Sequence, residues 1–85
     1  MILECARWTI RHDYGGYNNV YSAAANVSDC QRKCRDNRFC TAIDWVLVDY
    51  TGKNKRCWLV GSWTTSSGYR PDVQRITIDR KCGQE

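Results

Sequence analysis

The 85-residue chain has one histidine, one proline and no long apolar run, and each shortage narrows its class. No stretch approaches the ~18 apolar residues of a membrane-spanning helix, so we expect no membrane span. The first residues, MILECARW, have neither the apolar run nor the charged leader of a secretory signal. We therefore expect a mature or excised module in which Met1 was added for expression.

Metal-binding and catalytic patterns are equally scarce. There is no Cys-x2-Cys pair, and His12 alone cannot complete a paired zinc ligand set. His12 and Asp13 are the only adjacent histidine and carboxylate, and they begin a glycine-rich segment typical of a surface turn. Residues of a Ser/His/Asp site need not be adjacent in sequence, yet we expect no enzyme, no metal and no cofactor.

Cysteine, by contrast, is abundant. Six cysteines follow the spacing C-x24-C-x3-C-x5-C-x16-C-x24-C. An even number in so short a chain predicts disulfides, and disulfides predict an oxidising, extracellular compartment. A chain of this length buries only a small core, so cross-links would stabilise it. We expect a single domain over residues 1–85, with a connectivity that spacing alone leaves open.

Trp and Tyr are much more frequent in the sequence than Phe and Met. Four Trp and five Tyr accompany one Phe and one Met. Trp and Tyr are typical of half-exposed surfaces and interfaces, which favours a binding module. The net charge of +4 is compatible with an anionic partner but does not require one.

The segment NVSDCQRKCRDNRFC, residues 26–40, predicts a short helix running to about Asn37. Asn26 is a suitable N-cap, and Val27, Cys30 and Cys34 share one helical stripe. The two cysteines would therefore attach this stripe to the rest of the domain. Asn26 also begins an N-glycosylation sequon, so it is a possible glycan site as well as a cap.

The remaining segments predict strands. In Cys5–His12, Trp8 and Ile10 alternate with polar residues, and Thr41–Tyr50 is apolar on both faces. Further strands are expected at Arg56–Val60, Gly61–Ser67 (a short edge strand) and Val73–Arg80, with turns at His12–Asn19, Thr51–Lys55 and Gly68–Asp72. The fold class is α+β: a small disulfide-stapled domain with an antiparallel sheet of about five strands packed on one short helix.

The run VSDCQRKCRDNRFCTAIDW, the later Cys-Trp-Leu and the terminal cysteines resemble the PAN/apple domain family over Cys5 to Cys82. The resemblance implies the pairing Cys5–Cys82, Cys30–Cys57 and Cys34–Cys40. Domains of this family bind proteins or carbohydrates outside the cell and are not themselves catalytic. The resemblance therefore implies a secreted protein, or the extracellular part of a larger one, with no nucleic-acid partner.

Sugar binding needs aromatic faces with amides or carboxylates nearby. Trp8, Trp45 and Trp58 lie in expected strands and are assigned to the core. Trp63 lies among Gly, Ser and Thr, where little else could bury it. The candidate ligand-binding residues are Tyr14, Tyr17, Asn18, Trp63, Tyr69 and Asp72.

Basic residues offer a second candidate surface for an anionic polysaccharide. They flank the helix and the expected hairpin loop: Arg32, Arg35, Arg38, Lys53, Lys55 and Arg56. Such charges also commonly do no more than keep a protein surface solvated.

The leading hypothesis is a non-catalytic extracellular recognition or adhesion module that binds carbohydrate or glycoconjugate through loop aromatics. The alternatives are a protein–protein interaction or assembly module, helped or not by glycosaminoglycan, and a secreted inhibitor-type effector.

Overall fold

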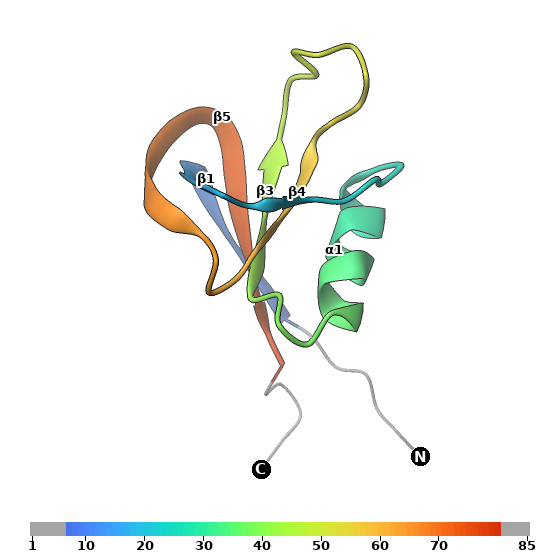
Figure 1. Ribbon diagram of the computed structural model, residues 1–85, viewed down its shortest axis with the longest axis vertical. Helices are drawn as coiled ribbons and strands as arrows, with labels where there is room; N and C mark the ends of the chain where they lie inside the picture. Colours follow the sequence, from blue (N-terminus) through green and yellow to red (C-terminus); the bar gives the residue numbers. More distant parts are fainter. Residues whose placement is uncertain (1–6, 81–85) are drawn as a thin grey trace.

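The computed structural model describes residues 7–80, which form one antiparallel sheet with a helix against it (Figure 1). The elements are, in chain order, β1 (Arg7–Tyr17), β2 (Val20–Tyr21), α1 (Val27–Asp36), β3 (Ala42–Val46), β4 (Cys57–Val60) and β5 (Thr65–Asp79). The five strands lie in the order β1-β5-β3-β4-β2. The α+β class and the single short helix expected from the sequence are confirmed. Within the described residues, no helix is long and apolar enough to cross a membrane.

Helix α1 has the expected cap and the expected buried stripe. The Asn26 side chain accepts a hydrogen bond from the Asp29 backbone N–H at 2.9 Å, which satisfies one of the unpaired donors of the first turn. Cys30 and Cys34 are fully buried, and Val27 packs beside them. The helix ends at the residue before Asn37, as the sequence predicted.

The hydrophobic core lies between α1 and the sheet. Alternate residues of the central strands point towards the helix, because successive side chains of a strand face opposite sides. They include Ile43 and Trp45 of β3, Leu59 of β4 and Ile76 of β5, all buried. The helix packs directly on β3 and β4. Trp45 is therefore a core residue, as expected.

Strands β1 and β5 are much longer than the sequence predicted. The turns expected at His12–Asn19 and Gly68–Asp72 are wrong, because most of both segments is strand and β1 pairs with β5 from Arg7 to Tyr17. The pairing is irregular, with register shifts after His12 and after Gly15. Asp13 and Asp72 adopt positive φ angles of 53° and 65°. The turn-forming residues thus bend a continuous ribbon, curved in Figure 1, instead of ending it.

Two further strand predictions need correction. β3 ends at Val46, and Leu47, Val48 and Tyr50 lie exposed in the loop before β4. Ile10 points to the helix side of the sheet but is 54% exposed, because β1 is an edge strand and α1 covers the strands further in. The apolar residues of these two segments therefore predicted a larger buried core than the structure has.

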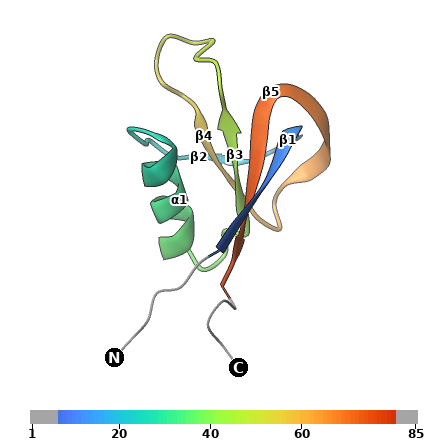
Figure 2. The same ribbon diagram turned by 180° about the vertical axis from the view of Figure 1, so that it is seen from behind.

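The last two residues of β1 and the two residues that follow it, residues 16–19, form a crossing segment that joins the two opposite edges of the sheet. In Figure 1 this segment passes in front of β3 and β4, and in Figure 2, seen from behind, it passes behind them. The side chains of Asp44, Trp58 and Arg75 belong to the sheet face turned away from the helix, because they alternate with core residues and pair with each other in register. The crossing segment lies over this second face.

Candidate ligand-binding pocket

A pocket of about 370 Å³ lies on the sheet face opposite α1. Its floor comes from the central strands, through Asp44, Val46, Trp58 and Val73. Three chain segments contribute its walls: the crossing segment, residues 16–19; the β3–β4 loop, through Val48, Tyr50, Thr51 and Lys55; and residues 70–71 of β5. Parts of the chain far apart in sequence therefore form one concave surface.

The carboxylate of Asp44 holds the crossing segment on the sheet. Asp44 is 3% exposed and forms an ion pair with Arg75, whose Nη2 donates to Oδ2 at 3.0 Å. The same oxygen accepts hydrogen bonds from the Gly16 backbone N–H at 2.9 Å and from Asn19 Nδ2 at 2.6 Å. A buried charge is tolerated only when it is paired and hydrogen-bonded, and Asp44 meets both conditions.

Gly16 is required by the close approach of the two layers. A Cβ atom at this position would lie 2.6 Å from the Thr64 Cγ2 atom and 2.7 Å from the Ser67 hydroxyl oxygen. Contacts this short are far inside van der Waals distance. A side chain at residue 16 would therefore push the crossing segment off the sheet and lengthen its bond to Asp44.

Three aromatic side chains line the pocket: Tyr17, Tyr50 and Trp58. Tyr17 is 54% exposed and Tyr50 is 70% exposed, so both rings are accessible. Trp58 is half-buried, and its indole N–H donates to the Lys55 carbonyl at 3.0 Å. The Trp58 ring also packs on Tyr21, with centroids 5.3 Å apart.

Asp72 fixes the position of Tyr50. The Tyr50 hydroxyl donates to Asp72 Oδ2 at 2.7 Å, and the Leu47 backbone N–H donates to the Asp72 carbonyl at 2.8 Å. The hydrogen bond to the carboxylate raises the pKa of Tyr50 above its ordinary value of 10.0, and desolvation and the negative charge of Asp72 act in the same direction. Tyr50 is therefore held as a neutral phenol on the rim of the pocket.

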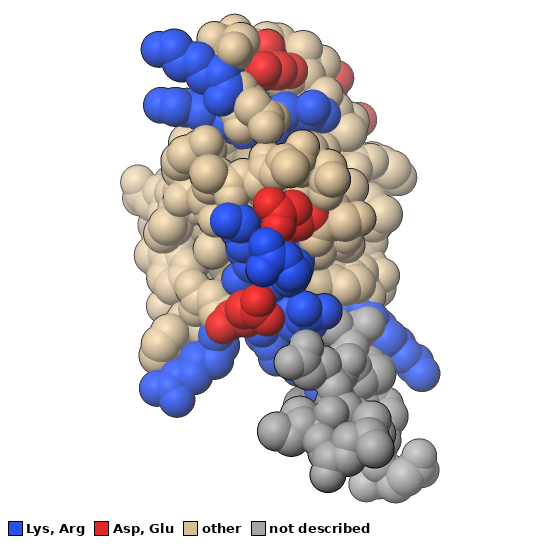
Figure 3. Space-filling model, turned by 90° about the vertical axis from the view of Figure 1, so that its right-hand side faces the viewer, with Lys and Arg blue, Asp and Glu red and all other residues tan. Residues whose placement is uncertain are grey.

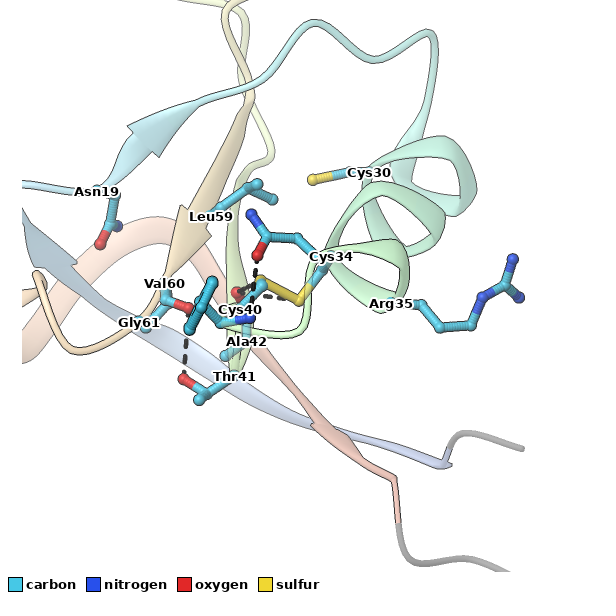
Figure 4. The surroundings of a disulfide bond; sticks show 12 residues. Asn19, Cys30, Cys34, Arg35, Cys40, Thr41, Ala42, Leu59, Val60 and Gly61 are labelled. Atoms are coloured by element: carbon cyan, nitrogen blue, oxygen red, sulfur yellow. Dashed lines mark hydrogen bonds between the residues drawn. A yellow bond between two sulfur atoms is a disulfide. The ribbon is translucent and has the colours of Figure 1, made fainter. Parts of the chain in front are cut away.

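Two disulfides fix α1 on the other face of the sheet, one to a strand and one to the loop that follows the helix. Cys30 is bonded to Cys57 of β4, and Cys34 is bonded to Cys40, which follows the helix. Figure 4 shows Cys30 and Cys34 on the same side of the helix and Arg35 pointing away from it. The third expected bond, Cys5–Cys82, lies outside the described residues. The two described bonds are two of the three that the family resemblance implied.

A family model described as PAN domain matches residues 11–60, more than half of the chain. This chain belongs to the PAN domain family. The match includes α1, both described disulfides and the crossing segment, and it ends before β5. Comparisons with curated proteins and with solved structures gave no significant match.

The pocket of this PAN domain contains only part of the ligand set expected from the sequence. Tyr17 and Asn18 line it, whereas Tyr14, Trp63, Tyr69 and Asp72 do not. Trp63 is half-buried against the core, and its indole N–H donates to the Leu59 carbonyl at 3.0 Å, so its ring is already used in packing. Tyr69, at 78% exposure, lies outside the pocket.

The sequence predicts other roles, or none, for several of the remaining pocket residues. It places Trp58 in the core and Tyr50 in a buried strand, and it names Asn19 only as an amide near the loop aromatics; Arg70 has no predicted role. The Arg70 guanidinium lies over the Tyr17 ring at 4.5 Å, and its Nη1 donates to the Gly16 carbonyl at 3.0 Å. For these residues, the one sequence feature that points to a polar site on this sheet face is Asp44, a carboxylate in an otherwise apolar strand.

The expected basic surface is divided between separate places. Figure 3 shows Lys and Arg side chains in one group at the upper end of the molecule and another along the helix side, with uncharged surface between them and acidic side chains among them. Arg56 donates to the carbonyls of Val46 and Leu47, and its guanidinium lies over the Trp45 ring, so it is part of the scaffold. Of the six candidates, only Lys55 lines the pocket.

Asn26 is exposed, and its Oδ1 atom makes the helix-capping bond. A glycan attaches to the side-chain nitrogen, Nδ2, which this bond does not use. Capping and glycosylation are therefore compatible at this residue. Occupancy of the sequon stays a prediction.

Proposed function

We propose that this PAN domain is a non-catalytic extracellular recognition module that binds a saccharide in the pocket on its second sheet face. The single observation that carries the proposal is the set of three aromatic side chains around one concave surface that also contains amide and cationic groups. PAN domains are in general interaction modules, and disulfides are typical of extracellular domains.

The pocket has the chemical groups that a sugar requires. Aromatic rings present large apolar faces with little conformational freedom, and these faces suit the C–H surface of a pyranose ring. Polar groups beside them then fix the orientation of the ligand. Asn18 supplies one such group, since its Nδ2 donates to Thr65 and its side-chain carbonyl stays available.

A glycan array, followed by calorimetry on any hit, tests this proposal. We expect Tyr17→Ala and Tyr50→Ala each to weaken binding by roughly tenfold or more, because truncation of a central aromatic contact usually costs over ~1.4 kcal/mol. Tyr69→Ala is the matched control, since this tyrosine is at least as exposed but lies outside the pocket, and we expect unchanged affinity. An array without any hit above background would overturn the proposal, as would equal loss in all three variants.

Exposed apolar residues favour a protein ligand as the second candidate. Leu47 and Val48 are 43% and 44% exposed in the β3–β4 loop, where Val48 also lines the pocket and Leu47 does not. Such residues commonly mark protein contacts when they cluster. A defined extracellular protein recovered by the wild type and lost with Leu47→Ser/Val48→Ser, together with an empty array, would support this function in place of saccharide binding.

A further inference from the structure

We infer that the pocket selects an acidic saccharide, one whose carboxylate lies against Lys55 and Arg70. This inference rests on the proposed function and specifies the ligand class of the same site. It comes from the distribution of charge in the pocket lining, where cationic side chains remain available and the one carboxylate, of Asp44, is ion-paired with Arg75.

Lys55 is the first cationic group. It lines the pocket, it is exposed, and its described contact is with an aromatic ring, since Nζ lies 5.7 Å from the Tyr21 centroid. Among residues 7–80, no carboxylate lies within ion-pair distance of it. A cation stacked on an aromatic ring keeps its charge available to a third group.

Arg70 is the second cationic group, and it is held in a fixed orientation. Nη1 donates to the Gly16 carbonyl at 3.0 Å, and the guanidinium plane lies over the Tyr17 ring. Both partners are neutral, so the positive charge of Arg70 has no carboxylate partner in the described part of the chain. A guanidinium that is already oriented loses little freedom when it binds a carboxylate.

The one carboxylate of the lining does not cancel these two charges. It belongs to Asp44, which is ion-paired with Arg75 and accepts hydrogen bonds from Gly16 and Asn19. Asp72 lies outside the lining; it accepts the Tyr50 hydroxyl and keeps its negative charge. An anionic ligand therefore meets two cationic groups in the lining, where the one carboxylate is already paired.

Neutral sugars and their acidic counterparts provide the test, because each pair differs at one group. Calorimetry would compare the methyl glycosides of galactose and galacturonic acid, and those of glucose and glucuronic acid, each acid with its carboxylate free; the methyl glycoside of sialic acid adds the second natural source of a sugar carboxylate. We expect at least one acid to bind roughly tenfold or more tightly than the neutral sugars, since a charge-assisted pair adds that much. We also expect this preference to shrink as salt is raised.

Two variants with a matched control locate the effect. Lys55→Gln should reduce the preference for acid over neutral sugar at least threefold, whereas Lys53→Gln, in the same loop but outside the pocket, should leave this preference unchanged. Arg70→Lys retains the charge and tests the guanidinium, with thermal unfolding as the check that the domain stays folded. Neutral sugars that bind as well as the acids, or tight binding of sulfated sugars alone, would overturn the inference while leaving saccharide binding intact. If no sugar binds, the proposed function itself fails.

Discussion

Asp44 shows how one residue can determine the second face of a small sheet. A buried carboxylate is costly to desolvate, and here an ion pair and two further hydrogen bonds offset that cost. The bonds connect β5, the crossing segment and β3, beside the buried Ala42, Val60 and Val73 on the same face of the sheet. The floor of the pocket therefore depends on a polar network as well as on apolar packing.

We predict that Asp44→Asn lowers the free energy of unfolding by about 3 kcal/mol, because it leaves the half-buried Arg75 without a counter-charge. Urea denaturation of the oxidised protein measures the change. Asp36→Asn is the control: Asp36 pairs with Arg32 on the exposed side of α1, and its loss should cost less than about 1 kcal/mol. Equal losses in the two variants would show that the Asp44 network contributes no more than a surface pair.

At the scale of elements, the end of β5 closes the C-terminal end of α1. The Arg80 guanidinium donates to the carbonyls of Cys40 at 2.7 Å, Cys34 at 2.8 Å and Asn37 at 3.0 Å. The last carbonyls of a helix have no partner within it, and a cation there also interacts favourably with the helix dipole. One side chain thus joins the last strand to the helix end and to the Cys34–Cys40 loop.

Replacement of Arg80 by alanine should cost about 2 kcal/mol of stability, because several part-buried carbonyls lose a charged donor together. Arg80→Lys should recover less than half of this loss, since an ammonium group cannot reproduce the fork of the guanidinium. Arg38→Ala serves as the control, because Arg38 is exposed and contacts only the Phe39 ring in the described structure. Thermal unfolding with calorimetry gives all three values, and full recovery by lysine would show that charge alone is needed.

The helix and the central strands could be predicted from sequence because their signals are local. Each signal falls within a few residues: the Asn26 cap and the cysteine stripe of α1, and the largely apolar run of β3. The long β1–β5 ribbon could not, since Asp13 and Asp72 take positive φ at bends that only pairing with the distant strand stabilises. Glycine-rich and proline-containing segments have the same composition whether they end a strand or bend it.

The candidate site was only partly predictable for a related reason. Tyr17 and Asn18 were recognised because loop aromatics and amides are visible locally. Trp58 and Arg70 enter the pocket only because β4 and β5 flank β3 in the sheet, and this strand order has no local signature. Trp63 failed as a candidate since Gly61, two residues earlier, leaves room for its ring: a Cβ atom there would lie 2.5 Å from it.

At the scale of the whole molecule, the disulfide-linked core and the candidate pocket lie on opposite faces of one sheet. The helix, the described disulfides and the apolar core occupy one face. The crossing segment, the Asp44 network and the pocket occupy the other. Loss of a disulfide should therefore weaken the helix face first, provided that the domain stays folded.

The two described disulfides should differ in what they contribute. Cys30–Cys57 joins residues 27 apart and Cys34–Cys40 residues 6 apart, so the chain-entropy model predicts about 3.5 and about 2 kcal/mol. We expect Cys30→Ala/Cys57→Ala to be the more destabilising pair in urea denaturation. In the same variant, hydrogen exchange should accelerate for the α1 amides relative to the Gly16 amide, whose bond to Asp44 lies on the opposite face. A larger loss from Cys34→Ala/Cys40→Ala would contradict the loop-length argument. Equal acceleration at Gly16 would show instead that the two faces unfold as one unit, with the pocket as dependent on the helix as the core is.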